Sequence, residues 1–141
     1  MVSQGLGIGL VQEPWIGSAG NILGLGQVGK ILADSQSNRP RTCIVFNKNI
    51  NFFPITEFVT SDLCAAEIKV DGRKLIVASA YFPGEEVSCP PAIVERLVEY
   101  TNSRGIQLII GCDANAHHTA WGSNDINERG ESLFNYILSM N

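Results

Sequence analysis

The chain has 141 residues, a formal net charge of −4 and a hydrophobic fraction of 45%, as expected for one globular domain over residues 1–141 that can bury a core without disulfides. No stretch approaches the roughly 20 apolar residues of a membrane span, so we expect no membrane partner. The net negative charge argues against the class of proteins that bind nucleic acid by charge alone, because those proteins carry a basic stripe.

The N-terminal part of the chain predicts two short strands separated by a long loop. Residues 7–12 (GIGLVQ) and residues 42–46 (TCIVF) are short apolar runs typical of buried strands. Residues 17–40 are rich in Gly, Ser and Asn, which favours a loop. Within that loop, residues 24–29 match the nucleotide-binding string GxGxxG. Such a motif needs a strand directly before it and a helix directly after it, and neither is predicted, so we interpret it as a surface loop.

The middle of the chain predicts a β-hairpin. Residues 63–70 alternate between apolar and charged positions at their end, and residues 75–81 are apolar almost throughout. Asp71-Gly72 between them is a strong two-residue turn signal, because Gly accepts a positive φ. A strand as apolar as 75–81 is expected to be covered on both faces.

The C-terminal part predicts two helices around one more buried strand. Pro90 and Pro91 suit the first turn of a helix that Gly105 would end. Residues 106–111 (IQLIIG) form the next apolar run, and residues 130–140 place their apolar positions at helical spacing. Strands interleaved with helices, including one hairpin, predict an α/β fold with mixed sheets.

The cysteines indicate a reducing compartment. Cys43, Cys64, Cys89 and Cys112 are widely spaced and form neither a CxxC pair nor a zinc pattern. Three of them lie in or beside apolar runs, which favours buried, reduced thiols over disulfides. The N-terminus shows no basic segment followed by an apolar run, so no secretory signal is expected. We therefore expect an intracellular protein.

Four polar side chains lie at the ends of predicted buried strands. Glu13, Tyr81 and Asp113 each end or follow such a strand, and Asn115 comes two residues after Asp113. In an extended segment, residues i and i+2 point to the same face, so Asp113 and Asn115 would lie side by side. Mg²⁺ prefers oxygen ligands and usually takes only one or two carboxylates. Glu13 and Asp113 beside a neutral Asn115 suit that demand.

Each of these residues also has a plainer interpretation. Asp113 and Asn115 are residue types that start turns through side-chain to backbone hydrogen bonds. Glu13, directly before Pro14, would be a solvated strand end, and Tyr81 a half-buried core residue. The adjacent His117 and His118 lack a ligand at metal spacing on a shared helix, which favours a packing or capping role over a zinc site.

Four motifs resemble those of non-LTR retrotransposon endonucleases. They are IIGCDANAHHTAWGS at residues 109–123, NERG at 127–130, VQEPW at 11–15 and ASAYFPG at 78–84. All four occur in the order typical of that family and cover nearly the whole chain. The resemblance implies the exonuclease, endonuclease and phosphatase superfamily. It also implies a DNase-like α/β sandwich of two packed mixed β-sheets flanked by helices.

The resemblance also implies roles for the four residues. Glu13 would be the ligand of Mg²⁺, with Mn²⁺ as an alternative metal, and Tyr81 would contact the scissile phosphate. Asp113 would orient or deprotonate the attacking water, and Asn115 would position it. The implied activity is metal-dependent nicking of target duplex DNA. The implied partner is a reverse transcriptase domain of a parent polyprotein, which is absent from this chain, and the implied location is the nucleus.

Two departures from the family pattern lower the expected activity. The family begins with a strand that carries a metal-site Asn, and it ends with a further Asp and a Ser-Asp-His segment, none of which is found between Met1 and Asn141. We therefore expect an incomplete domain that does not cut DNA by itself, because catalytic residues act as a unit. The alternatives are a non-catalytic remnant or interaction module, and a related phosphoesterase that acts on lipid or small-molecule phosphates.

Overall fold

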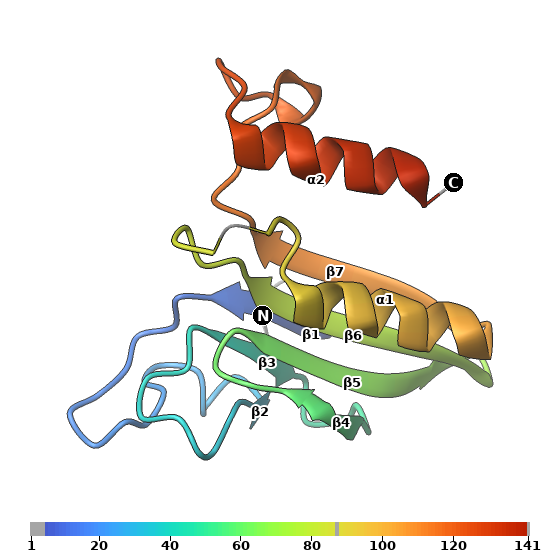
Figure 1. Cartoon of the computed structure of the whole chain (residues 1–141). Coiled ribbons are helices and arrows are strands. Elements are labelled where there is room, and N and C mark those ends of the chain that lie inside the picture. The colour runs from blue at the N-terminus through green and yellow to red at the C-terminus, as the bar shows by residue number, and fades with distance from the viewer. Residues whose placement is uncertain (1–4, 87, 141) are drawn as a thin grey trace.

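The structure is a computed structural model that describes residues 5–86 and 88–140. The described residues form two β-sheets, two α-helices and one 3-10 turn (Figure 1). The strands are β1 (Ile8–Gln12), β2 (Lys30–Leu32), β3 (Thr42–Phe46), β4 (Phe53–Val59), β5 (Leu63–Val70), β6 (Arg73–Tyr81) and β7 (Gln107–Asp113), and the helices are α1 (Ala92–Arg104), η2 (Thr119–Trp121) and α2 (Glu128–Ser139).

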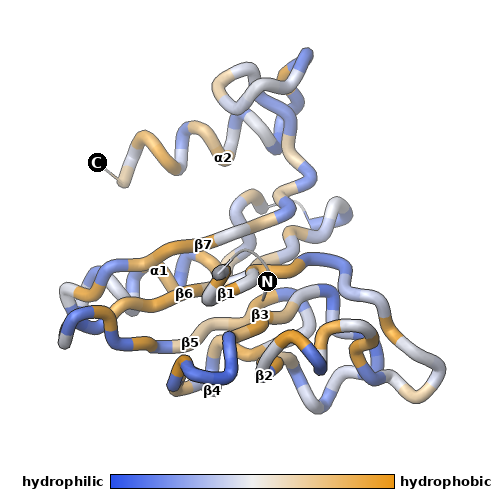
Figure 2. The backbone as a smooth tube through the Cα atoms, turned by 180° about the vertical axis from the view of Figure 1, so that it is seen from behind, coloured by the Kyte–Doolittle hydropathy of each residue, from blue (hydrophilic) through white to orange (hydrophobic). Residues whose placement is uncertain are grey.

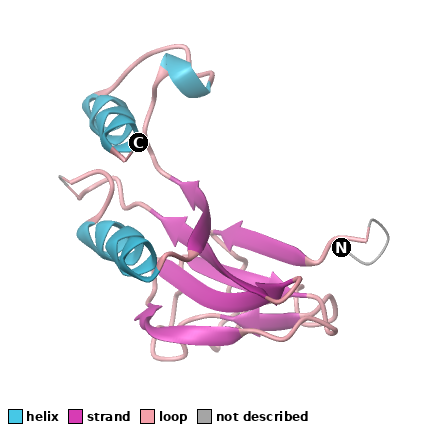
Figure 3. Cartoon of the chain, turned by 90° about the vertical axis from the view of Figure 1, so that its right-hand side faces the viewer, coloured by secondary structure: helices cyan, strands magenta, loops and turns pink. Residues whose placement is uncertain are grey.

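The two sheets pack face to face, and α1 covers the outer face of the larger one (Figures 1 and 3). The smaller sheet is antiparallel with the order β1-β3-β2, and the larger has the order β4-β5-β6-β7. The β6–β7 pair is parallel and the other pairs of the larger sheet are antiparallel. The expected fold class, an α/β sandwich with mixed strands, is confirmed.

Strands β5 and β6 are covered on both faces, which explains their apolar sequence. On one face Leu63, Ala65 and Ile76 pack toward Val94 and Leu97 of α1 in the first core cluster. On the other face Cys64, Ala66, Ile68 and Val77 pack against Ile44 and Phe46 of the smaller sheet. Figure 2 shows the same concentration of apolar segments along these central strands. The prediction of a doubly covered strand at 75–81 is confirmed.

The turn between β5 and β6 is the predicted hairpin. Asp71 and Gly72 both have positive φ values, 50° and 77°, as a two-residue turn of this kind requires. Val70 pairs with Arg73 directly across the turn. The local chemistry of these two residues therefore accounts for the reversal of chain direction here.

Two strands were not predicted from the sequence. β2 is only three residues long and lies inside the segment expected to be a loop. β4 contains Pro54 and mostly exposed side chains, and its pairing with β5 shifts register between Pro54 and Val59. Both strands lie at sheet edges, where short, irregular and polar strands are tolerated.

The glycine-rich string at residues 24–29 is a loop that leads into β2, and no helix follows it directly. Its last glycine is required by packing, because a Cβ at Gly29 would collide with the carbonyl oxygen of Phe46. At Gly26, in contrast, a Cβ would meet nothing within 4 Å. The rejection of a nucleotide-binding motif is supported, since close strand packing accounts for the one constrained glycine.

We expect Gly29→Ala to lower the free energy of unfolding by about 1–3 kcal/mol, the usual cost of forcing atoms into a well-packed site. Urea unfolding followed by circular dichroism measures the change, and Gly26→Ala serves as the matched control. A midpoint for Gly29→Ala equal to that of Gly26→Ala would show that β2 can move away from β3 at no cost.

The described cysteines are free thiols, and Cys43, Cys64 and Cys89 are buried while Cys112 is exposed. Burial raises the pKa of Cys43 to about 11 and that of Cys64 to about 12. These two thiols therefore stay protonated at neutral pH and act as small apolar core residues. Within the described ranges, no helix is long and apolar enough to span a membrane.

Candidate active site

Tyr81 and Asp113 lie side by side where β6 and β7 end. They are register partners in the parallel pair, and the backbone N–H of Phe82 extends the ladder by donating to the carbonyl of Asp113 at 2.9 Å. Because partners in a parallel pair project to the same face, the two side chains share one face of the larger sheet. The structure therefore brings together two predicted site residues that are far apart in the sequence.

A partly buried polar network brings the end of β1 to the same place. The amide Nε2 of Gln12 donates to Ser79 Oγ at 2.8 Å and to the carbonyl of Gly111 at 3.1 Å. The hydroxyl of Thr42 also reaches Ser79 Oγ. Ser79 and Gly111 lie two residues before Tyr81 and Asp113, and Gln12 lies directly before Glu13. Glu13 therefore stands next to the ends of β6 and β7.

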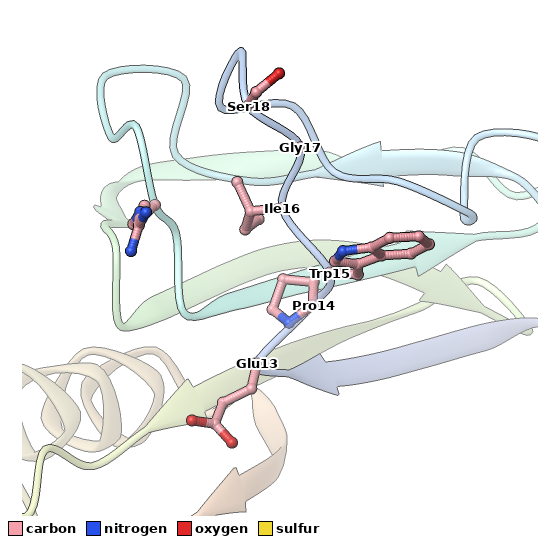
Figure 4. Close-up of a pocket in the computed structure, with 7 residues that line it drawn as sticks. Glu13, Pro14, Trp15, Ile16, Gly17 and Ser18 are labelled. Atoms are coloured by element: carbon pink, nitrogen blue, oxygen red, sulfur yellow. The ribbon is translucent and has the colours of Figure 1, made fainter.

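Glu13 is held in an unusual backbone conformation. Its φ is 50°, and its N–H donates to the carbonyl of Arg41 at 2.8 Å. A non-glycine residue in this region costs about 1–3 kcal/mol and persists only where surrounding contacts enforce it. The exposed carboxylate takes part in no hydrogen bond or ion pair among the described residues. Figure 4 shows it turned away from the following loop, toward the ends of the larger sheet.

Asp113 and Asn115 are arranged differently from the prediction. β7 ends at Asp113 and Asn115 has a φ of 45°, so the two residues do not lie on one extended strand. Asp113 Oδ1 instead accepts from the N–H of Asn115 at 3.2 Å, and Asn115 Nδ2 donates to the carbonyl of Phe82 at 3.0 Å. The prediction that the two side chains share one face of a strand was therefore wrong. The alternative interpretation, a turn started by side-chain to backbone hydrogen bonds, is correct. This turn still keeps both side chains at the edge of the sheet.

Tyr81 is flanked by an ion pair that the sequence did not indicate. Arg41 donates to both carboxylate oxygens of Asp62 at 2.6 and 2.7 Å, and its guanidinium lies 4.7 Å from the centre of the Tyr81 ring. The hydrogen bond to Asp62 raises the pKa of Arg41. The carbonyl of Asp62 accepts from the Tyr81 N–H at 2.8 Å. This pair fixes the ring of Tyr81 from one side.

Arg129 is the functional candidate that sequence reasoning missed, although it lies within the NERG motif. Its guanidinium donates to backbone carbonyls of the two loops that follow β6 and β7. The acceptors are Asn115 at 3.0 Å, Ala114 at 3.0 Å, Glu86 at 2.7 Å and Phe82 at 3.5 Å. Because all its partners are main-chain atoms, no side-chain pattern could have indicated them.

The rest of NERG anchors α2 to the histidine loop. Asn127 caps α2 by accepting from the N–H of Gly130 at 2.7 Å and from that of His117 at 3.0 Å. A Cβ at Gly130 would collide with the carbonyl of His117. His118 is 7% exposed, stacks on Phe134 at 4.3 Å and accepts from Ala120 N–H, and its neighbour His117 contacts Asp125. The predicted packing and capping role is confirmed for His118.

The oxygen ligands at this edge match the needs of a hard divalent cation. Glu13 and Asp113 offer two carboxylates, and the Oδ1 atom of Asn115 accepts no hydrogen bond from the described residues. A Mg²⁺ site of this kind is completed by water and phosphate oxygens. Across residues 5–86 and 88–140, no cluster of three or more His, Cys, Asp or Glu residues could hold a metal by itself. The ligand chemistry therefore fits an ion shared between protein and substrate.

Two surface hollows flank this edge of the sheet. Glu13 lines one of about 570 Å³ together with Trp15 and Arg39. Asp113 and Asn115 line a second hollow of about 640 Å³. Residues of α2 line the same hollow. Both hollows are large enough for a nucleotide-sized ligand. The candidate site thus lies between two hollows.

Two comparisons with known proteins found a match. Residues 75–141, which include Tyr81, Asp113, Asn115 and Arg129, match a family model described as endonuclease-reverse transcriptase. The solved structure titled "Endonuclease domain of TRAS1, a telomere-specific non-LTR retrotransposon" superposes with a TM-score of 0.75 at 20% identity, covering 99% of this chain. The comparison with curated proteins found no match.

These two matches confirm the resemblance to retrotransposon endonucleases. The chain has the fold of such a domain, and it spans 60% of the length of the solved structure. The family model covers the strand ends with Tyr81 and Asp113 but does not reach Glu13. The pairing of Glu13 with these residues comes from the geometry of this chain.

Proposed function

We propose that this chain is a metal-dependent DNA endonuclease domain that hydrolyses one phosphodiester bond of a target duplex. The observation that carries the proposal is the meeting of Glu13, Tyr81 and Asp113 at one edge of the sheet, held there by Gln12 and Ser79. The proposal takes residues 1–141 as one domain. It assigns the chain to a parent protein that also contains a reverse transcriptase domain and works in the nucleus.

The metal in this proposal is Mg²⁺, or Mn²⁺, held by Glu13 with Asp113 and Asn115 nearby. When bound there, it would neutralise charge on the phosphate oxygens and ease departure of the leaving oxygen. Two carboxylates with no described cationic partner provide the negative charge that such an ion needs.

Three side chains would accept the proton, contact the phosphate and position the water. The second carboxylate oxygen of Asp113 accepts no described hydrogen bond, so it can take a proton from the attacking water. The hydroxyl of Tyr81 can donate to a phosphate oxygen while Arg41 holds the ring. The Oδ1 atom of Asn115 can accept from the same water, since its Nδ2 is already fixed to Phe82. Positioned groups of this kind provide most of the rate in hydrolysis of phosphodiesters.

The proposal is tested by nicking of supercoiled plasmid with the purified chain, in Mg²⁺ and in chelator. The sequence alone predicts no cutting by the chain itself. Because the four groups meet at one edge and neither carboxylate has a cationic partner among the described residues, the proposal predicts measurable nicking that stops in chelator. Folded protein that never nicks would contradict the proposal and favour the non-catalytic alternative. Release of phosphate head groups without nicking would favour the phosphoesterase alternative.

A further inference from the structure

Trp15 presents an uncovered aromatic ring on a fixed backbone. It is 75% exposed, the most of any large hydrophobic residue described. Its carbonyl accepts from the N–H of Leu23 at 2.8 Å, and the adjacent Ile16 pairs with Ile22 across the loop. The preceding Pro14 is buried. An apolar surface held in place before a partner arrives loses little entropy on binding.

Trp15 shares its hollow with a cation that has no acidic partner. The hollow of about 570 Å³ is lined by Glu13, Trp15 and Arg39 among others (Figure 4). Arg39 takes part in no ion pair among the described side chains, whereas nearby Arg41 is bound to Asp62 and Glu85. The backbone of Arg39 is fixed, because its N–H donates to Ser37 Oγ and its carbonyl accepts from Ser61 Oγ.

The net charge of the chain limits how it can hold a polyanion. At −4 it repels a DNA strand overall, so affinity must come in part from contacts that do not depend on charge. Stacking of a base on an aromatic ring is such a contact, and it tolerates any sequence. An arginine that lines the same hollow can then bind one backbone phosphate.

We propose that Trp15 and Arg39 form a nucleotide subsite beside the scissile phosphate. In this subsite a base stacks on the indole of Trp15, and a phosphate of the same strand pairs with Arg39. Bases inside a duplex have their faces covered by their neighbours, so the ligand is a strand with an unpaired or displaced nucleotide next to the cut. The inference rests on the proposed function, since it takes DNA as the substrate.

The test measures binding without cleavage. Because the chain has two tryptophans, Trp121→Phe leaves Trp15 as the sole indole reporter. In chelator, we expect a 12-nucleotide oligothymidylate to quench this emission, and a blunt-ended two-strand duplex with no unpaired base to quench it less. Trp15→Ala should weaken binding of the oligothymidylate, measured by anisotropy of a labelled strand, by about 5- to 150-fold. Trp15→Phe should keep part of the affinity, and Arg39→Gln should reduce the salt dependence by about 0.7 of a unit in log–log slope.

Phe53→Ala is the matched control. Phe53 is an exposed aromatic residue, 62% accessible, but it pairs with Glu67 toward the hairpin end of the larger sheet, away from Glu13. The Phe53→Ala substitution should leave binding of the oligothymidylate unchanged. Equal affinity for Trp15→Ala and Phe53→Ala, or no quenching by the single strand, would overturn the subsite.

Plasmid nicking by the same preparations separates this inference from the proposed function. Binding that depends on Trp15 in a chain that never nicks would support the subsite and contradict the nuclease proposal. Nicking that is unchanged in Trp15→Ala, with an unchanged KM for plasmid, would overturn the subsite and leave the nuclease proposal standing.

Discussion

Asp113→Asn is expected to lower the rate of metal-dependent plasmid nicking by about 10²- to 10⁴-fold, the usual contribution of a positioned acid or base. The amide oxygen of Asn can still accept the hydrogen bond that Asp113 Oδ1 receives from Asn115, so the turn should persist. What is lost is the negative charge and the ability to accept a proton. Glu13→Gln is expected to lower the nicking rate by a similar factor, because it removes the other carboxylate without changing side-chain size.

The control for these variants is Asp71→Asn. Asp71 is an exposed carboxylate in the hairpin turn, and Asn accepts the positive φ of 50° found there. Initial rates with supercoiled plasmid, at matched circular dichroism spectra, give the comparison. If Asp113→Asn nicks as fast as Asp71→Asn, Asp113 takes no part in the chemistry.

Arg129→Met is expected to lower both stability and rate. It leaves the carbonyls of Phe82, Glu86, Ala114 and Asn115 without their common donor. The unfolding free energy should fall by about 1–3 kcal/mol, the cost of leaving acceptors unsatisfied. The nicking rate should fall by about 10²-fold, because the two loops that position Tyr81 and Asp113 are no longer tied together.

Two further variants show whether Arg129 acts by positioning. Arg129→Lys keeps the charge but not the planar fork, so it should restore stability in part and the rate only slightly. Arg96→Met removes an exposed arginine of α1 and should change neither. A positioning role predicts a lower kcat at an unchanged KM for plasmid. A wild-type kcat in folded Arg129→Met would show that the tie between the loops is dispensable.

The predictable parts of the fold are those set by local chemistry. Asp71-Gly72 specifies its hairpin turn, and Pro91 and Gly105 bound α1 as expected. β6 is buried over most of its length and is a continuous apolar run, so it was found. β7 was also found from its apolar run, but the expectation that it is buried was wrong, because it is an edge strand with Ile109 53% exposed. β2 and β4 were missed because short edge strands depend on their neighbour for pairing and not on their own pattern.

The candidate site was predictable in its residues but not in its geometry. Polar residues at the ends of buried strands indicated Glu13, Tyr81 and Asp113 as a group. The sequence could not show that Glu13 and Asn115 adopt positive φ values, because both conformations are enforced by tertiary hydrogen bonds. Nor could it show the part-buried contact of Gln12 with Ser79, which joins residues 67 positions apart.

The central claim is that Glu13, at the end of β1, holds one divalent cation next to Asp113 of the other sheet. Titration of Mn²⁺ followed by electron paramagnetic resonance measures it directly, without any turnover. We expect one bound ion per chain, with an affinity that Glu13→Gln weakens by more than the roughly 10- to 100-fold cost of losing an outer partner, and that Asp113→Asn weakens by no more than that cost. An affinity that Glu13→Gln leaves unchanged would contradict this site.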